Sequence, residues 1–431
     1  MCRLLALASL AIVASSSPAS APSLAWTQLA ANVPVPPSTL APAGRSGAIL
    51  FAAGGGGGVA LAGGCSSSCC YAPLADLWVF DGGVWTNISQ SGALPAPRLY
   101  HSSSAAAVNA SAASVSTFVF GGTDVVTGVL NDLWLVTLTQ AGTWSAAWQQ
   151  LSAGGPSPAL PSPRTGQSQT ALPAKEGGGV ADGSFVIFGG VGEDAVVADA
   201  WLYTTSGGGG AGAFSSVAIA AGSGPGPRTQ HAALILSLPL PSGGGRVSRV
   251  LVVSGGSDDT GDCHDDVWAL SLDATTPAWL LLGSSASVGA SPWPSVRHGH
   301  AIWAATASPA ASAMERLGAV GGGPSQASSI AFTLFGGQNS SVADPANFLG
   351  DTWSFNVALA VTSDGGISLA AGTGVFTLIN TGGNAPSPRA LGGIVSDPAG
   401  SGAVYASGFG GYNGGTDDRL YNDVWHAVVS S

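Results

Sequence analysis

The densest group of residues that could do chemistry is the segment Asp258–Asp266, which holds five carboxylates and one histidine within nine residues. Carboxylates this close repel one another unless water or a cation neutralises them. A hard cation such as Ca²⁺ would take their oxygens as ligands, with Asp258, Asp262 and Asp266 as the candidates. Because the spacing is not that of an EF-hand, we expect a hydrated acidic loop, keep Ca²⁺ as the alternative and predict no other cofactor.

The cysteines indicate a disulfide rather than a metal centre. Cys65, Cys69 and Cys70 lie close together in the chain, and Cys263 lies within the acidic segment. Cys2 lies in the predicted leader, and the other four cysteines allow three pairings. A bridge requires Cα atoms within about 7 Å of each other. We expect one local bridge within Cys65–Cys70, with Cys263 either free or paired with a partner.

Three histidines share a position in the sequence, since His101, His231 and His300 each follow an arginine by three residues. Imidazole nitrogens bind transition metals, but three histidines on separate repeats are not expected to converge, so we assign them a structural role. The sequence contains no Gly-x-Ser-x-Gly, no phosphate-binding loop and no HExxH motif. Several common hydrolase and nucleotide-binding classes are therefore excluded.

These residues belong to a pattern that recurs six times. Each copy has an arginine before an apolar run that ends in Gly-Gly, and then Asp-x-Trp. The arginines are Arg45, Arg98, Arg164, Arg228, Arg297 and Arg389, and the tryptophans are Trp78, Trp134, Trp201, Trp268, Trp353 and Trp425. Five copies end with an aromatic three residues before an aliphatic side chain. The sixth copy stops at Ser431 without that phrase, which Trp26–Leu29 supplies at the other end of the chain. A closed ring accounts for this split, whereas a linear array does not.

The repeats predict an all-β fold. Each copy contains four short runs rich in Val, Ile, Leu, Phe and Trp, separated by Gly, Pro, Ser and Ala. Such runs predict strands, such separators predict turns, and four strands per repeat predict the blades of a β-propeller. The order of the phrases resembles the kelch repeat, whose blade has Gly-Gly after its second strand and an aromatic residue in its third. The resemblance extends from Trp26 to Trp425.

This resemblance implies a six-bladed kelch-type propeller over residues 22–431, with blades that start near residues 45, 98, 164, 228, 297 and 389. Segment 25–29 would close the ring as the last strand of the sixth blade. We expect the extra length of the repeats in surface loops such as Ala105–Ser116 and Ala358–Gly374. Each blade arginine is expected to pair with a carboxylate or carbonyl of its own blade, and a ring of guanidinium groups facing an anionic ligand is the alternative.

The first 21 residues predict a secretory signal peptide. Arg3 precedes the apolar run Leu4–Ala14, and Ala19–Ala21 has the small-x-small form of a cleavage site. Eleven apolar residues are too few to span a bilayer. We therefore expect secretion or residence in an endomembrane lumen.

Composition restricts the partner. Net charge is −11, only 8% of the residues are charged, and no basic stripe is present, so nucleic acid and anionic membranes are not expected as partners. Three sequons, at Asn87, Asn109 and Asn339, agree with a secreted protein. We expect Asn109 and Asn339 in loops, and Asn87 in a less accessible strand.

The expected function is binding. Loops after Gly-Gly and loops before each blade arginine should emerge on one face, because strands alternate in direction. The candidate binding residues of this face are Glu193, Asp194, Asp258, Asp259, Asp262, His264, Asp265, Asp417 and Asp418. The sequence predicts a scaffold for a basic or cation-bridged protein or glycan.

The alternative function is that of a kelch-type enzyme with an axial pocket, which would be either a sugar-modifying enzyme or a metal-dependent lyase of the specifier type. Titratable groups at the axis would favour the enzyme, and small apolar stretches such as Ser102–Ala107 favour the binding protein.

Overall fold

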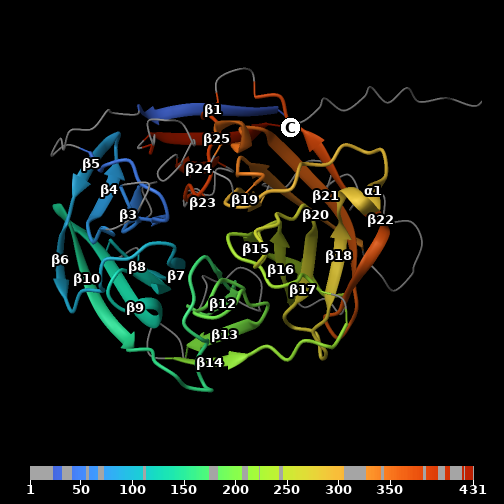
Figure 1. The fold of residues 1–431 in the computed structure, drawn as a ribbon, viewed down its shortest axis with the longest axis horizontal. Coiled ribbons are helices and arrows are strands. Elements are labelled where there is room, and N and C mark those ends of the chain that lie inside the picture. The colour runs from blue at the N-terminus through green and yellow to red at the C-terminus, as the bar shows by residue number, and fades with distance from the viewer. Residues whose placement is uncertain are drawn as a thin grey trace, which may run out of the picture.

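The computed structural model describes residues 23–31, 41–54, 58–66, 72–109, 113–173, 183–205, 212–222, 224–241, 246–304, 327–340, 344–381, 385–396, 403–407, 420–421 and 423–430. Within these ranges the chain forms six β-sheets arranged around a common axis (Figure 1). The all-β propeller expected from the repeats is therefore confirmed. The predicted leader, Cys69, Cys70, Asp417 and Asp418 lie outside the described residues.

The first three sheets follow the order of the chain. The first contains β2 (Ile49–Ala52), β3 (Val59–Ala62), β4 (Leu77–Asp81) and β5 (Val84–Asn87). The second contains β7 (Ser102–Asn109), β8 (Ser114–Asp124), β9 (Gly128–Ala141) and β10 (Thr143–Ser152), with β6 (Ser89–Gly92) at its outer edge. The third contains β11 (Ser168–Ala171), β12 (Phe185–Phe188), β13 (Ala200–Thr205) and β14 (Gly212–Ser216).

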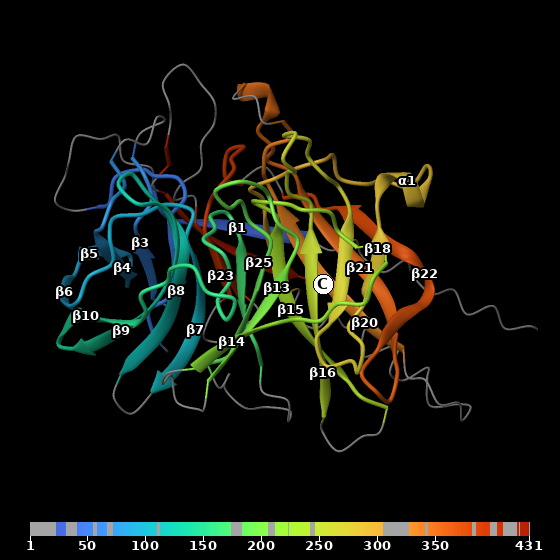
Figure 2. The same ribbon diagram turned by 60° about the horizontal axis from the view of Figure 1, so that its bottom comes forward.

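The other three sheets repeat this plan. The fourth contains β15 (Ala232–Pro239), β16 (Val247–Ser254), β17 (Val267–Ser271) and β18 (Trp279–Gly283). The fifth contains β19 (Ala301–Ala304), β20 (Ala327–Phe335), β21 (Thr352–Val361) and β22 (Ile367–Leu378). The sixth contains β23 (Ile394–Ser396), β24 (Ala403–Ser407), β25 (Val424–Ser430) and β1 (Ser23–Ala30). The short helix α1 (Ser285–Val288) contacts β18 and β22 at the periphery (Figure 2), and a 3₁₀ turn spans Pro345–Asn347.

The ring is closed on itself. The first strands of successive sheets contact one another in the order β2, β7, β11, β15, β19 and β23, and β23 contacts β2 again. At the seam, β1 pairs with β25 in antiparallel register, with Trp26 opposite Ala427 and Gln28 opposite Trp425. The N-terminal strand therefore completes the sixth sheet, as the split repeat predicted.

The core lies between neighbouring sheets, because each of the two faces of a blade is covered by the blade on that side. Phe118 of β8 packs 5.3 Å from Phe185 of β12, measured between ring centroids. The ring of Phe185 in turn stacks on Tyr203 of β13 at 4.9 Å. Strands that are buried on both faces consist almost entirely of apolar residues. Phe185–Phe188 and Val250–Val253 are buried strand segments of this kind.

The prediction of surface loops is wrong for two segments. Ala105–Ser116 belongs largely to β7 and β8, and Ala358–Gly374 belongs largely to β21 and β22. In both places the repeat is longer because a hairpin is longer. Strand β7 pairs with β8 as far as Asn109 and Ser114, and β21 pairs with β22 as far as Val361 and Ile367. The parallel strand β6, which pairs with β10, was not predicted at all. It covers the outer edge of the second sheet and so protects an edge that could pair with another chain.

Candidate functional site

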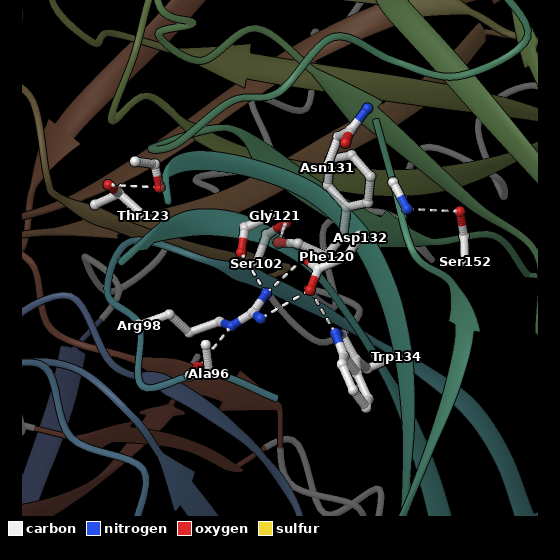
Figure 3. A network of polar contacts seen from close by, with 12 residues as sticks. Ala96, Arg98, Ser102, Phe120, Gly121, Thr123, Asn131, Asp132, Trp134 and Ser152 are labelled. Atoms are coloured by element: carbon white, nitrogen blue, oxygen red, sulfur yellow. Dashed lines mark hydrogen bonds and ion pairs between the residues drawn. The ribbon is translucent and has the colours of Figure 1, made fainter. Parts of the chain in front are cut away.

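The blade arginine is the centre of a polar unit, which Figure 3 shows in the second sheet. Arg98 Nη1 and Nη2 donate to Asp132 Oδ1 and Oδ2 at 2.7 and 2.8 Å, and Nη1 also donates to the carbonyl of Gly121 at 3.0 Å. Trp134 Nε1 donates to the same carboxylate at 2.6 Å. The spacing Asp-x-Trp thus places an indole donor and a carboxylate on one side of a strand, where they complete the arginine's contacts.

The arginine, aspartate and tryptophan of this unit occur together in all six sheets. The ion pairs are Arg45–Asp76, Arg98–Asp132, Arg164–Asp199, Arg228–Asp266, Arg297–Asp351 and Arg389–Asp423, at 2.6 to 2.8 Å. Burial opposes ionisation of Asp76, Asp199, Asp266 and Asp351, but the arginine hydrogen bonds and charge outweigh it and lower the pKa of each carboxyl. All six arginines are buried, so none presents its guanidinium to an anionic ligand.

The Gly-Gly doublets join one sheet to the next. The N–H of Gly122 donates to the carbonyl of Arg164 at 3.0 Å, and the N–H of Gly190 donates to the carbonyl of Arg228 at 2.9 Å. A Cβ on Gly122 would lie 2.8 Å from the carbonyl oxygen of Leu99, and its φ is +89°. Only glycine accepts both this close approach and this backbone conformation. The doublets are therefore parts of the scaffold.

A cavity of about 180 Å³ lies on the axis. Its lining comes from the second and third residues after every blade arginine, so all six repeats contribute. These residues are Gly47, Ala48, Tyr100, His101, Gly166, Gln167, Gln230, His231, Gly299, His300, Leu391 and Gly392. In the first five repeats the residue just before each pair bridges to the segment after Gly-Gly, as Thr229 does with Ser257. The cavity therefore opens at the end of the ring that carries the acidic segment, which we call the loop face.

Six of the lining residues form a ring that the sequence reading missed, and we call them the axial collar. They are Gly47, Tyr100, Gly166, Gln230, Gly299 and Leu391, and all have φ between +52° and +67°. The N–H of each collar residue from Tyr100 to Leu391 donates to the carbonyl of the preceding collar residue at 2.7 to 3.0 Å. The available signal was the alternation of glycine with a larger residue two places after each blade arginine.

The three histidines at the axis do not form a metal site. His101, His231 and His300 come from the second, fourth and fifth sheets, and each is more than nine-tenths buried. His231 Nε2 lies 2.9 Å from Ser168 Oγ, and His300 Nε2 lies 3.3 Å from Ser254 Oγ. Burial, helped by the charge of the neighbouring blade arginine, lowers the pKa of His101 and His231 to about 3 and that of His300 well below 6.5. They are uncharged and weakly basic at neutral pH.

The burial of these histidines in the neutral form predicts that the protein loses stability in mild acid. An unfolded histidine takes up a proton below about pH 6.5, whereas the folded protein keeps His101 and His231 neutral down to about pH 3. Between these values the unfolded state binds more protons, so the free energy of unfolding falls as the pH falls. At pH 4.5 the expected loss is about 3 kcal/mol for each histidine.

Urea unfolding at pH 7 and pH 4.5 measures this loss. Gln167 occupies the same position in the third repeat, so His101→Gln and His231→Gln introduce a residue that the fold already accepts there. Each variant should lose less stability than the parent between the two pH values. The same decrease in parent and variants would show that these imidazoles are not what destabilises the protein in acid.

The acidic segment is organised by its own hydrogen bonds. Asp258 Oδ1 accepts from the N–H and Oγ1 of Thr260 at 3.0 and 2.6 Å and from the N–H of Asp262 at 3.0 Å. The hydroxyl of Thr260, the main cause, lowers the pKa of Asp258. Both oxygens of Asp266 are held by Arg228. Since Asp266 is committed to the blade, it does not join Asp258 and Asp262, and the described residues contain no group of three acidic, His or Cys side chains suited to a metal ion.

The other predicted binding residues that the structure describes lie on the loop face. Glu193, Asp194, Asp259 and Asp262 are exposed, and His264 and Asp265 are half-buried. Where the chain is described, eight arginines are the only Arg or Lys residues, and six of them are the buried blade arginines. Of the remaining two, Arg249 lies in β16 and Arg246 directly precedes this strand. Both belong to the β15–β16 hairpin, at the end of the ring opposite the loop face. Among the described residues, the segments that carry Glu193, Asp194, Asp259 and Asp262 therefore contain exposed carboxylates but no Arg or Lys.

The cysteines are only partly described. Cys65 is completely buried, and Cys263 is a free thiol. Burial, together with the charges of Asp262 and Asp258, raises the pKa of Cys263 to about 11. Cys69 and Cys70 lie outside the described residues, so the local bridge stays a prediction.

A comparison with protein-family models agrees with this architecture. The family model described as the KLHDC2/KLHL20/DRC7 Kelch-repeats domain matches residues 85–308, a little over half of the chain. No curated protein matches the sequence. One similar solved structure, titled "Structure of YjhT", is 13% identical and aligns over 91% of this chain and 99% of that chain, with a TM-score of 0.48. No helix among the described residues is long and apolar enough to cross a membrane.

Proposed function

Since this chain belongs to the kelch-repeat family, we propose that it is a secreted scaffold whose loop face binds a basic protein. The observation that carries this proposal is the unequal exposure of charge on that face. Glu193, Asp194 and Asp259 are exposed, whereas every blade arginine is buried in an ion pair. A surface of one sign attracts partners of the opposite sign and repels like-charged ones.

The axial cavity supports binding more than catalysis. A general base works best with a pKa near the working pH, and burial lowers the pKa of His101 and His231 to about 3. The blade carboxylates beside them are held by arginines. His101 and His231 thus line the axis, but neither is poised to exchange a proton at neutral pH.

Secretion is part of the proposal, and two features support it. Asn87 and Ser89 of the first sequon are exposed while Ile88 between them is buried, so Asn87 is more accessible than its place in a strand suggested. Cys65 is buried and Cys263 is a free thiol, so the proposal keeps one bridge within Cys65–Cys70. Disulfides persist in oxidising compartments.

Binding to a fluorescent oligolysine peptide, followed by anisotropy at several salt concentrations, tests the proposal. Glu193→Gln, Asp194→Asn and Asp259→Asn remove exposed charges that make no hydrogen bond with described side chains. At about 0.2–1 kcal/mol for each exposed charge, the triple variant should bind roughly tenfold more weakly and with less salt dependence.

The control removes a charge from the opposite end of the ring. Asp364→Asn changes an exposed turn between β21 and β22, and this variant should bind like the parent. The proposal fails if the parent does not bind the peptide. It also fails if the triple variant binds as tightly as the parent.

A further inference from the structure

We propose that the axial cavity receives one basic side chain, a lysine or arginine of the partner, and that the collar residues Tyr100, Gln230 and Leu391 contact it. This inference rests on the proposed function, because it assumes a basic partner on the loop face. It adds the position of a specific contact that the acidic residues alone do not provide.

The backbone of the collar is the first argument. Tyr100, Gln230 and Leu391 have φ of 52°, 52° and 59°, a conformation that costs a non-glycine residue about 1–2 kcal/mol. The equivalent positions of the other three repeats are glycines, which adopt it without this cost. Strained residues are retained where their side chains contribute to packing or function, so these three side chains have a use that glycine would not supply.

Sterics explain why only alternate repeats carry such a side chain. A Cβ on Gly47 would lie 2.9 Å from Cδ1 of Tyr100, and a Cβ on Gly299 would lie 2.9 Å from Cδ2 of Leu391. Tyr100 and Leu391 therefore lie over the glycine of the preceding repeat. At Gly166 the atom closest to an added Cβ would be Oγ1 of Thr229, with Cγ of Gln230 at 3.5 Å. Three half-buried side chains, from the second, fourth and sixth sheets, consequently surround the cavity mouth.

The chemistry of the three side chains suits a long basic residue. Leu391 and the ring of Tyr100 offer apolar surface to an alkyl stem, and an aromatic face also attracts a cation. Gln230 adds an amide, which is held in place because its Oε1 lies 2.6 Å from His298 Nδ1. No side chain of this set carries a charge at neutral pH.

The surrounding charges select a cation. His101, His231 and His300 line the cavity in the neutral form, so they do not repel a positive group. Carboxylates such as Asp259 are exposed on the same face and attract it. An acidic side chain would instead meet this negative field without finding an exposed cation among the described residues.

The size of the cavity limits what enters. At about 30 Å³ for each water, 180 Å³ corresponds to roughly six water molecules. Pockets that enclose drug-sized ligands are larger, about 300–1,000 Å³. One side chain fits this volume better than a folded peptide segment does.

Saturation-transfer NMR with two matched probes tests this inference. Nα-acetyl-lysine amide carries the ammonium group, and Nα-acetyl-norleucine amide has the same stem without it. We expect transfer from the full-length protein to the lysine probe and at least tenfold less to the norleucine probe. Equal transfer to both probes would overturn the inference.

Collar variants locate the contact. Tyr100→Gly and Gln230→Gly place at these positions the residue that Gly47 and Gly166 already provide, so the backbone conformation is retained. Combined, they should abolish transfer to the lysine probe, with circular dichroism confirming that the sheets remain. Should this pair unfold, Leu391→Gly serves as the second variant and should reduce the transfer severalfold.

The outcomes separate the two proposals. If the folded collar variants bind both the lysine probe and oligolysine like the parent, while Glu193→Gln, Asp194→Asn and Asp259→Asn together weaken oligolysine binding, the collar inference is wrong and the scaffold proposal stands. If neither set of changes affects oligolysine binding, both are wrong.

Discussion

Deletion of residues 23–30 is expected to unfold the whole ring rather than to loosen one sheet. The deletion removes β1, which pairs with β25 and supplies the outer strand of the sixth sheet. It also removes Trp26, whose ring lies 5.0 Å from Phe335 and 6.2 Å from Trp303 in the fifth sheet. Loss of a buried tryptophan alone destabilises a protein by about 3–5 kcal/mol. That amount is comparable to the total stability of many proteins, about 5–15 kcal/mol.

Thermal unfolding followed by circular dichroism measures the effect of this deletion. Trp26→Ala should have a substantial part of the effect, because Trp26 is buried. Thr27→Ala is the matched control, since Thr27 is the exposed neighbour on the same strand, and it should leave the midpoint nearly unchanged. A deletion variant that melts at the parent's temperature would show that the ring does not depend on β1.

Arg98→Ala is expected to destabilise the protein by about 3–5 kcal/mol, because it leaves a buried carboxylate without its partner. The Asp132 side chain is only 11% exposed, so water cannot replace the guanidinium. The carbonyl of Gly121 would lose a donor at the same time. Urea unfolding at neutral pH gives the change in the free energy of unfolding.

The third repeat supplies a matched comparison for this variant. Arg164 makes the same ion pair, but the side chain of its partner Asp199 is 43% exposed. Water can hydrate that carboxylate once the arginine is gone, so Arg164→Ala should cost less than Arg98→Ala. The double variant Arg98→Met, Asp132→Leu should recover part of the loss, because it leaves no unpaired buried charge. Equal costs at Arg98 and Arg164 would contradict this account.

The sequence determined the fold because the scaffold is repeated and local. Six copies of Arg, Gly-Gly and Asp-x-Trp indicated six similar sheets, and the displaced phrase Trp26–Leu29 indicated how the last sheet is completed. Each of these repeated motifs makes the same contact in every repeat where the structure describes it, either within its own sheet or with the next one. Arg98 needs Asp132 and Gly121, and the second glycine of a doublet must approach the next sheet closely. A requirement that recurs six times is visible in one sequence.

The candidate site was less predictable, because it depends on how different repeats meet. The acidic residues of the loop face could be named from the chain, yet only the structure shows that Asp266 is held by Arg228 while Asp259 is exposed. His101 and His231 are neutral because they are buried between blades. This burial cannot be predicted from the residue type alone. Strand β6 likewise pairs with β10, which is distant from it in the chain.

The axial collar shows most clearly what only the tertiary structure decided. Gly47, Tyr100 and Gln230 are far apart in the chain and differ in residue type, so their common position two residues after a blade arginine does not by itself show that they meet. They meet because closure of the ring brings the second residue after every blade arginine to the axis, where Tyr100 and Leu391 each require a glycine on the preceding repeat. Contacts within a repeat are encoded locally and can be read from the chain, whereas the cavity exists only once all the repeats have closed around it.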